Sequence, residues 1–157
     1  MGFKTNVMRI LDKNKIEYRS HCYENSGAIS GTEVAKALGE DPEQVFKTLV
    51  TKGKSGEFFV FMIPVKEELD LKKAAAAVNE KSIEMIKQKD LLKTTGYIHG
   101  GCSPIGMKKQ FKTAIHLTAE RFETIIFSAG KIGWQVELSL DSLRKVIDVN
   151  AADIIVK

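Results

Sequence analysis

Two apolar runs, VFKTLVT at residues 45–51 and EFFVFMI at residues 57–63, flank the short polar segment KGKSG. Both runs are rich in β-branched and aromatic residues, and each has the length of one strand. A short glycine-containing connection between two such runs is typical of a β-hairpin. The pattern therefore predicts an antiparallel hairpin near the middle of the chain, so the fold must contain a sheet.

Helix-like and strand-like segments alternate irregularly around this hairpin. Apolar spacing and capping residues predict helices at 5–14, 30–39, 70–79, 90–96 and 139–148. Apolar runs predict further strands at 16–23, 82–86, 113–117, 124–128 and 134–138. Ser30 and Glu33 have the spacing of a capping box, and Asp41 with Pro42 suits the start of a further turn.

No regular βαβ rhythm, linker or internal repeat is visible in this order of elements. We therefore expect one mixed α/β (α+β) domain that spans residues 1–157. Its sheet should be curved, mixed and mostly antiparallel, forming a partial barrel flanked by helices.

The composition is that of an ordinary globular protein with a small basic excess. The 157 residues include 24 Lys or Arg and 20 Asp or Glu, a net charge of +4, which permits an RNA partner without requiring one. No apolar run is long enough to span a bilayer, and the N-terminal segment lacks the apolar core of a signal peptide. Two cysteines do not make a disulfide framework, so we expect a cytoplasmic protein without a membrane partner.

Lys47 interrupts the apolar strand VFKTLVT. The two-residue period of a strand places it on one face with Val45 and Leu49. Phe46 and Thr48 then point to the opposite face. Lysine is seldom buried without a partner, so this face is either solvated or lines a pocket. In a pocket, Lys47 would offer a fixed cation to an ester carbonyl, a carboxylate or a phosphate.

Glycine and proline gather in the segment GYIHGGCSPIGMKKQ, residues 96–110. Neither residue suits the interior of a helix or a central strand, so this segment is a loop whose backbone can come close to a ligand. A second glycine turn, FSAGKIGWQVEL at 127–138, follows a predicted strand and adds Lys131. Either segment alone could be an ordinary surface turn. Together with the strand lysine, they indicate a polar pocket.

Two familiar loop chemistries match this glycine-rich segment only in part. Gly101 and Gly106 have the separation of a Walker A loop, but Met107 stands where the lysine is needed. The segment GCS at 101–103 is half of a nucleophile elbow, and its closing glycine comes one residue late. A serine triad at Ser103 would need a histidine brought close by folding alone.

Metal and thiol chemistry are weaker alternatives. His99 and Cys102 could ligate a metal together with His21 and Cys22, but the usual spaced pairs of ligands are absent, so we expect no metal site. Cys102 as a nucleophile is a further alternative.

Four stretches, VFKTLV, LDLKKAA, TGYIHGGCSPIGMKK and SAGKIGWQVEL, stand in the order and spacing typical of the YbaK/EbsC family. That family comprises free-standing aminoacyl-tRNA deacylases related to the editing domain of bacterial prolyl-tRNA synthetases. The resemblance runs from the first predicted helix to DVNAADI, and within the family the sequence is most similar to the Cys-tRNA(Pro) deacylases. It implies a curved mixed sheet with a pocket for the 3′-terminal adenosine of tRNA and its aminoacyl group.

The resemblance also implies roles for particular residues. Lys47 matches the essential lysine of the family and is the implied catalytic residue. The implied substrate-binding residues are Tyr23, Ser30, Thr48, Gly100, Gly101, Ser103, Gly130 and Gln135. Related enzymes often carry an aromatic residue at the place of Ser30 and an aspartate at that of Gln135, which leaves the amino-acid specificity open. No cofactor is implied.

The function that we expect is therefore trans-editing of Cys-tRNA(Pro), with Cys-tRNA(Cys) open as a second substrate. A synthetase pocket for proline cannot strongly exclude cysteine or alanine, since a methylene-sized difference is worth only ~1–3 kcal/mol. No general base is evident, in line with family chemistry assisted by the substrate's own thiol or a ribose hydroxyl. The alternatives are a non-catalytic module that binds an RNA end or a nucleotide, and a deacylase for another small amino acid, as in Ala-tRNA(Pro). A need for prolyl-tRNA synthetase as partner stays open.

Overall fold

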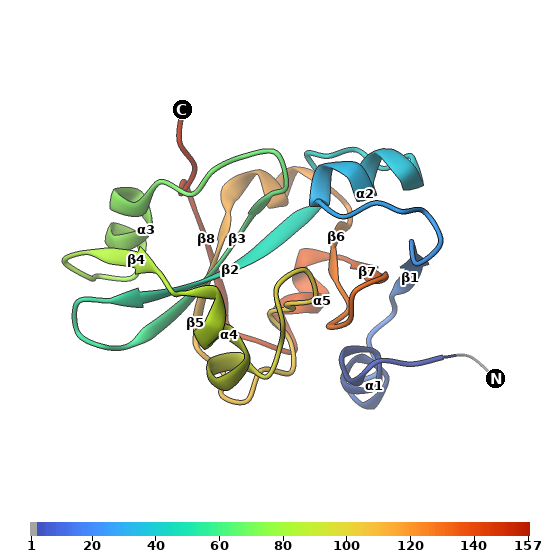
Figure 1. The fold of residues 1–157 in the computed structure, drawn as a ribbon, viewed down its shortest axis with the longest axis horizontal. Coiled ribbons are helices and arrows are strands. Elements are labelled where there is room, and N and C mark those ends of the chain that lie inside the picture. The colour runs from blue at the N-terminus through green and yellow to red at the C-terminus, as the bar shows by residue number, and fades with distance from the viewer. Residues whose placement is uncertain (1–2) are drawn as a thin grey trace.

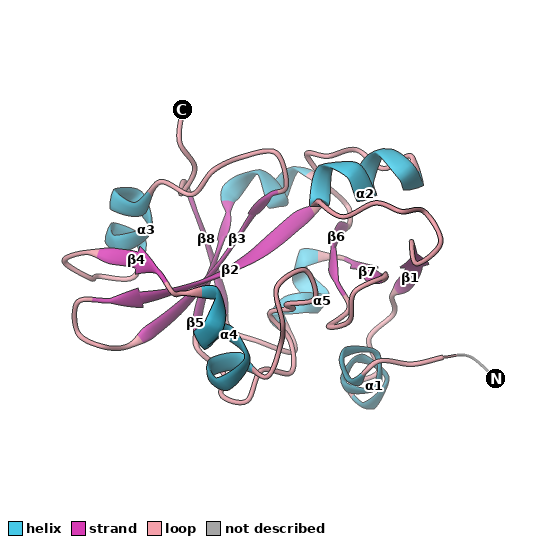
Figure 2. Cartoon of the chain, in the orientation of Figure 1, coloured by secondary structure: helices cyan, strands magenta, loops and turns pink. Residues whose placement is uncertain are grey.

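A computed structural model describes residues 3–157, which form five α-helices, one 3-10 helix and eight strands (Figures 1 and 2). The helices are α1 (Asn6–Lys13), α2 (Gly31–Leu38), α3 (Leu71–Ala77), α4 (Gln88–Thr95), η1 (Leu117–Arg121) and α5 (Leu140–Arg144). The strands are β1 (Arg19–Cys22), β2 (Phe46–Gly53), β3 (Phe58–Pro64), β4 (Ile83–Met85), β5 (Lys112–His116), β6 (Ile125–Ser128), β7 (Trp134–Leu138) and β8 (Val149–Ala152). Over this range no helix is both long and apolar enough to cross a membrane.

The strands form two sheets. The larger is mixed, with the order β4-β2-β3-β5-β8: β2 is antiparallel to β3 and β4, whereas β5 is parallel to β3 and β8. The smaller, β1-β7-β6, is antiparallel, and a bridge between Val45 and Ile126 joins the two. The mixed, mostly antiparallel α+β class is confirmed. In place of the predicted single sheet there are two sheets, and among residues 3–157 no strand pairing closes them into a barrel.

The predicted hairpin is β2–β3, and every predicted helix and strand is present within a few residues of its expected place. The capping box at the start of α2 is also confirmed: Ser30 Oγ accepts from Glu33 N at 3.2 Å, and Glu33 Oε1 accepts from Ser30 N at 3.3 Å. The segment after Asp41 is a turn, in which Asp41 Oδ1 accepts from Glu43 N. Strand β8 was not predicted, because its four residues VNAA are mostly of low strand propensity and its place depends on pairing with β5.

The main core lies between the two sheets. Phe46 of β2 and Met62 of β3 meet Phe127 of β6 and Val136 of β7 there, with α1 and α5 packed around them. Helix α3 covers the opposite face of the larger sheet, where Phe61 of β3 is fully buried. Helix α4 packs on the same face as the main core, so both faces of β2 are covered (Figure 1).

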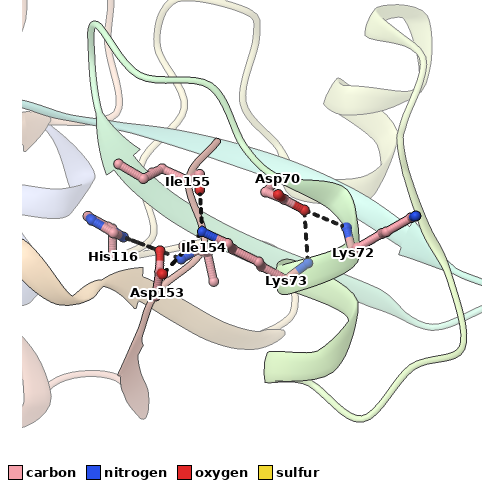
Figure 3. Close-up of polar contacts among 7 residues, drawn as sticks. All are labelled: Asp70, Lys72, Lys73, His116, Asp153, Ile154 and Ile155. Atoms are coloured by element: carbon pink, nitrogen blue, oxygen red, sulfur yellow. Dashed lines mark hydrogen bonds and ion pairs between the residues drawn. The ribbon is translucent and has the colours of Figure 1, made fainter. Parts of the chain in front are cut away.

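The C-terminal segment is fastened to the larger sheet by a polar cluster (Figure 3). The amide of Ile154 donates to Nδ1 of the buried His116 at 3.3 Å. Lys73 Nζ donates to Asp153 Oδ2 at 3.1 Å and to the carbonyl of Ile155 at 2.9 Å. Burial lowers the pKa of His116, in keeping with a neutral imidazole that accepts a backbone hydrogen bond.

Candidate functional site

A cavity of about 340 Å³ lies at the open edge of β2. On that side, β4 pairs with β2 only from Thr51 onward, and the backbone pairing with β6 is limited to the bridge of Val45, just before β2, with Ile126. Residues 46–49 therefore have a neighbouring strand on one side only, which is the β3 side. The predicted site residues that line the cavity are Tyr23, Ser30, Lys47, Thr48, Gly100 and Gln135.

The ladder register directs the backbone of Thr48 toward this edge. Val65 N donates to Val45 O, and Gly53 N donates to Glu57 O, so the odd-numbered residues of β2 make the hydrogen bonds to β3. In an antiparallel pair the residues between them present their amide and carbonyl groups to the other side. The N–H and C=O of Thr48 therefore face the cavity, where no strand competes for them.

Lys47 and Thr48 reach the cavity from opposite faces of the strand. Lys47 shares its face with Val45 and Leu49, and Thr48 lies on the face of Phe46, so the predicted alternation is confirmed. The cavity extends around the strand edge and meets both faces. Among residues 3–157, no hydrogen-bond partner reaches the buried hydroxyl of Thr48.

The Lys47 ammonium is half-buried and carries no direct counter-ion: within residues 3–157, no carboxylate lies within 4 Å of it. Burial lowers the pKa of Lys47, and the charges of Glu68 and Glu67 act in the opposite direction. The C-terminal segment contacts the loop that carries Glu67 and Glu68, since Val156 N donates to Glu68 O at 2.9 Å. The site therefore presents an unpaired cation that can meet an oxygen gaining negative charge.

Gln135 is held by a carboxylate that the sequence did not point out. With its amide oriented by its hydrogen-bond partners, Gln135 Nε2 donates to Glu40 Oε2 at 2.8 Å and to Oε1 at 3.2 Å. Burial raises the pKa of Glu40, while the nearby His21 and the Gln135 hydrogen bond act in the opposite direction. The nitrogen of the Gln135 amide is thus committed, and its oxygen remains as an acceptor. Glu40 follows the glycine that ends α2 and gives no sequence signal of this contact.

Three predicted site residues do not line the cavity. A Cβ on Gly101 would come within 3.1 Å of Ile132 N, so this glycine allows two loops to pack together. Ser103 is fully buried, and its Oγ accepts from Ile105 N at 3.3 Å. Gly130 has a φ of +86° and packs against Tyr97. Substrate contact by Gly101, Ser103 or Gly130 stays a prediction, whereas Gly100 lines the cavity with a φ of +88°.

The residues considered for other chemistries are dispersed. His99 and Cys102 both line the cavity, but burial raises the pKa of Cys102 to about 12, which keeps its thiol protonated and unreactive. Cys22 is exposed on β1, and His116 belongs to the C-terminal cluster. In the described part of the chain, no three His, Cys, Asp or Glu side chains are grouped to hold a metal ion.

Much of the remaining wall of the cavity is apolar. Ile29, Phe127 and Leu91 line it from the loop before α2, from β6 and from α4. The sequence analysis placed Phe127 in a strand and Leu91 in a helix and gave Ile29 no role, because no local signal distinguishes an apolar residue that faces a cavity from one in the core. Across residues 3–157, no Asp or Glu belongs to the lining.

The α+β fold thus places an unpaired cation, Lys47, at the open edge of a strand and beside an apolar wall. The family model of the aminoacyl-tRNA editing domain matches residues 27–146. The chain belongs to the aminoacyl-tRNA editing domain family.

Sequence relatives agree with this membership. The chain is 44% identical over 155 residues to an Enterococcus faecalis protein named "Putative Cys-tRNA(Pro)/Cys-tRNA(Cys) deacylase EbsC", with 98% of this chain and 94% of that protein covered. It is 30% identical over 124 residues to a proline–tRNA ligase of Fervidobacterium nodosum, covering 79% of this chain but 21% of the ligase.

Solved structures show the same fold. A crystal structure described as "a putative trans-editing enzyme for prolyl tRNA synthetase" matches with a TM-score of 0.82 at 18% identity, over 99% of this chain and 100% of that one. A crystal structure of "hypothetical protein APE2540" matches with a TM-score of 0.87 at 16% identity, over 97% and 100% of the two chains.

Proposed function

We propose that the protein is a trans-editing deacylase that cleaves the aminoacyl ester of Cys-tRNA(Pro). The observation that carries this proposal is the half-buried, unpaired Lys47 ammonium at a cavity in an aminoacyl-tRNA editing domain. The printed name of the Enterococcus faecalis relative supports cysteine as the amino acid removed.

The size of the cavity suits a small aminoacyl group. Ligand pockets commonly measure about 300–1,000 Å³, so a cavity of about 340 Å³ lies near the small end of that range. A cysteine ester with part of its ribose fits such a volume. The apolar wall formed by Phe127 and Leu91 suits the uncharged thiol-bearing side chain.

Lys47 and the strand edge supply the groups that ester cleavage needs. As a nucleophile attacks the carbonyl carbon, the carbonyl oxygen gains negative charge, which the Lys47 ammonium and the inward-facing amide of Thr48 stabilise. Gln135 offers its amide oxygen to a donor such as the α-ammonium group of the substrate.

We propose that the nucleophile comes from the substrate; among the lining side chains of residues 3–157, none is a carboxylate and the Cys102 thiol is held protonated. The substrate thiol loses its proton to water, and its sulfur bonds to the carbonyl carbon. The carbon–oxygen ester bond then breaks, and the ribose oxygen takes up a proton. A vicinal ribose hydroxyl that assists water would give free cysteine instead of a cyclic thioester, so product analysis separates the two routes.

The test is loss of the ester from Cys-tRNA(Pro), Pro-tRNA(Pro) and Ala-tRNA(Pro) under single-turnover conditions. We expect Cys-tRNA(Pro) to be cleaved fastest. Equal rates on all three, or cleavage of none, would overturn the assignment. Binding of a charged tRNA without cleavage would indicate a non-catalytic module that binds RNA ends. Repeating the assay with prolyl-tRNA synthetase present shows whether that partner changes the rate.

A further inference from the structure

The positive charge of the protein is concentrated in one segment, residues 87–112. This segment contains six of the 24 basic residues and one of the 20 acidic residues, so its net charge is +5. The rest of the chain keeps 18 basic and 19 acidic residues, a net charge of −1. The overall net charge of +4 therefore comes entirely from this segment. The segment is strongly basic although the net charge of the whole chain is small.

Folding brings the two halves of this segment together. We call its six lysines the lysine face: Lys87, Lys89, Lys93, Lys108, Lys109 and Lys112. The first three belong to α4 and its N-cap, and the others to the loop before β5 and its first residue. Lys108 N donates to Thr95 O at 2.9 Å, and Lys108 Nζ lies 3.5 Å from Lys93 O, so the loop lies against the end of α4.

The charges of the lysine face are available to a partner. All six lysines are exposed. Within residues 3–157, only Lys93 of the six is in an ion pair, with Asp90 Oδ1 at 3.0 Å. A cluster of exposed lysines, most of them without an ion pair, is the electrostatic footprint of a polyanion-binding site.

The lysine face adjoins the cavity through the same segment. Leu91 of α4 and His99, Gly100 and Cys102 of the following loop line the cavity, while the lysines of α4 and of the loop before β5 lie on the outer surface. A ligand that spans both must carry a small group for the cavity and several phosphates beyond it. The acceptor end of a charged tRNA has this combination.

We propose that the lysine face binds the phosphate backbone of the tRNA acceptor stem and thereby directs the 3′ end into the cavity at β2. This inference rests on the proposed deacylase function, because that function supplies the 3′ end. Lysines act on phosphates as point charges, so the surface gives affinity and orientation with little reading of base sequence.

The test compares two triple variants with the same loss of charge. The lysine-face variant replaces three lysines whose side chains make no hydrogen bond or ion pair among the described residues: Lys89→Gln, Lys109→Gln and Lys112→Gln. The control variant replaces three equally exposed lysines outside the segment: Lys13→Gln, Lys81→Gln and Lys145→Gln. The probe is uncharged tRNA(Pro), whose Kd is measured over a range of salt concentrations.

We expect the lysine-face variant to bind at least about ten-fold more weakly at low salt, with a log–log salt slope reduced by about 1 for each lysine. The control variant should bind like the wild type. In single-turnover deacylation, the half-saturating enzyme concentration should rise by the same factor as Kd. Binding by the lysine-face variant that matches the control would overturn the proposal, as would equal weakening of both variants.

The same measurements separate this proposal from the proposed function. Suppose that the wild-type protein cleaves Cys-tRNA(Pro) and the lysine-face variant binds tRNA as well as the control variant. This result would refute only the proposal that the lysine face binds tRNA. Suppose instead that the wild-type protein cleaves no charged tRNA and the lysine-face variant no longer binds tRNA. This result would refute only the proposed deacylase function.

Discussion

Replacing Thr48 with valine should make the protein more stable. The Thr48 hydroxyl is buried and has no hydrogen-bond partner among residues 3–157. Leaving a buried polar group unsatisfied costs about 1–3 kcal/mol, and valine has nearly the same shape without the polar atom. We therefore expect the free energy of unfolding to rise by about 1–3 kcal/mol. For a chain of 157 residues, each kcal/mol raises Tm by about 2–4 °C.

The same strand offers a matched control. The hydroxyl of Thr51 in β2 is buried as well, in a fully buried residue, but this Oγ1 donates to Phe59 O at 3.0 Å. Thr51→Val removes a hydrogen bond that is made, so the free energy of unfolding should fall by about 0.5–1.5 kcal/mol. The two substitutions are chemically identical and their expected effects have opposite signs. Urea unfolding followed by circular dichroism measures both.

A Thr48→Val protein that is destabilised as much as Thr51→Val would refute the reasoning, because the hydroxyl would then have a partner in solution. Deacylation adds a second measurement. The backbone groups of Thr48 face the cavity and survive the substitution, so we expect the rate to remain within about three-fold, a difference of less than 1 kcal/mol. A loss of a hundred-fold would show that the hydroxyl itself contacts the substrate.

Three further substitutions test the site and the C-terminal cluster. Lys47→Ala should lower the single-turnover rate by at least about a hundred-fold, the usual effect of removing an oxyanion-stabilising group, with an unchanged circular dichroism spectrum; full activity would leave Lys47 as a merely solvated side chain. Cys102→Ala should keep most activity because burial raises the pKa of this thiol to about 12, and an inactive variant would indicate a cysteine nucleophile. The pKa of His116 is lower in the folded protein than its ordinary 6.5, so the unfolded chain binds the proton more readily and stability should fall as pH drops below about 6.5. His116→Gln should flatten that part of the pH profile in urea unfolding, and a profile identical to the wild type would contradict this assignment.

Glu40 illustrates how a site can be completed by a residue without a sequence signal. Its carboxylate accepts hydrogen bonds from the amide of Gln135. Gln135 is the residue at whose place related enzymes often carry an aspartate. The glutamine thus lacks the charge, but a carboxylate from the end of α2 lies directly behind it. The electrostatics of this wall therefore depend on two segments that are distant in the chain.

Local patterns in the sequence are sufficient for most of the secondary structure and for the face on which Lys47 lies. The β2–β3 hairpin, the capping box of α2 and the glycine that ends α4 all depend on residues a few positions apart. The side-chain alternation that places Lys47 with Leu49 also needs only the period of one strand. Such features are set by backbone geometry, which acts within a single segment.

The cavity itself is decided by the tertiary structure. It exists because β4 begins to pair with β2 only at Thr51, while β6 pairs only with Val45, just before β2, so the edge between them is left open. These partners lie more than thirty positions away along the chain, and no local pattern specifies where such a pairing begins or ends. The same holds for β8, for the contact of Glu40 with Gln135, and for the meeting of the lysines of α4 with those before β5. The sequence determined which residue types were available for a site, and long-range packing decided which of them meet, since the contacts between distant segments form only when the whole core closes.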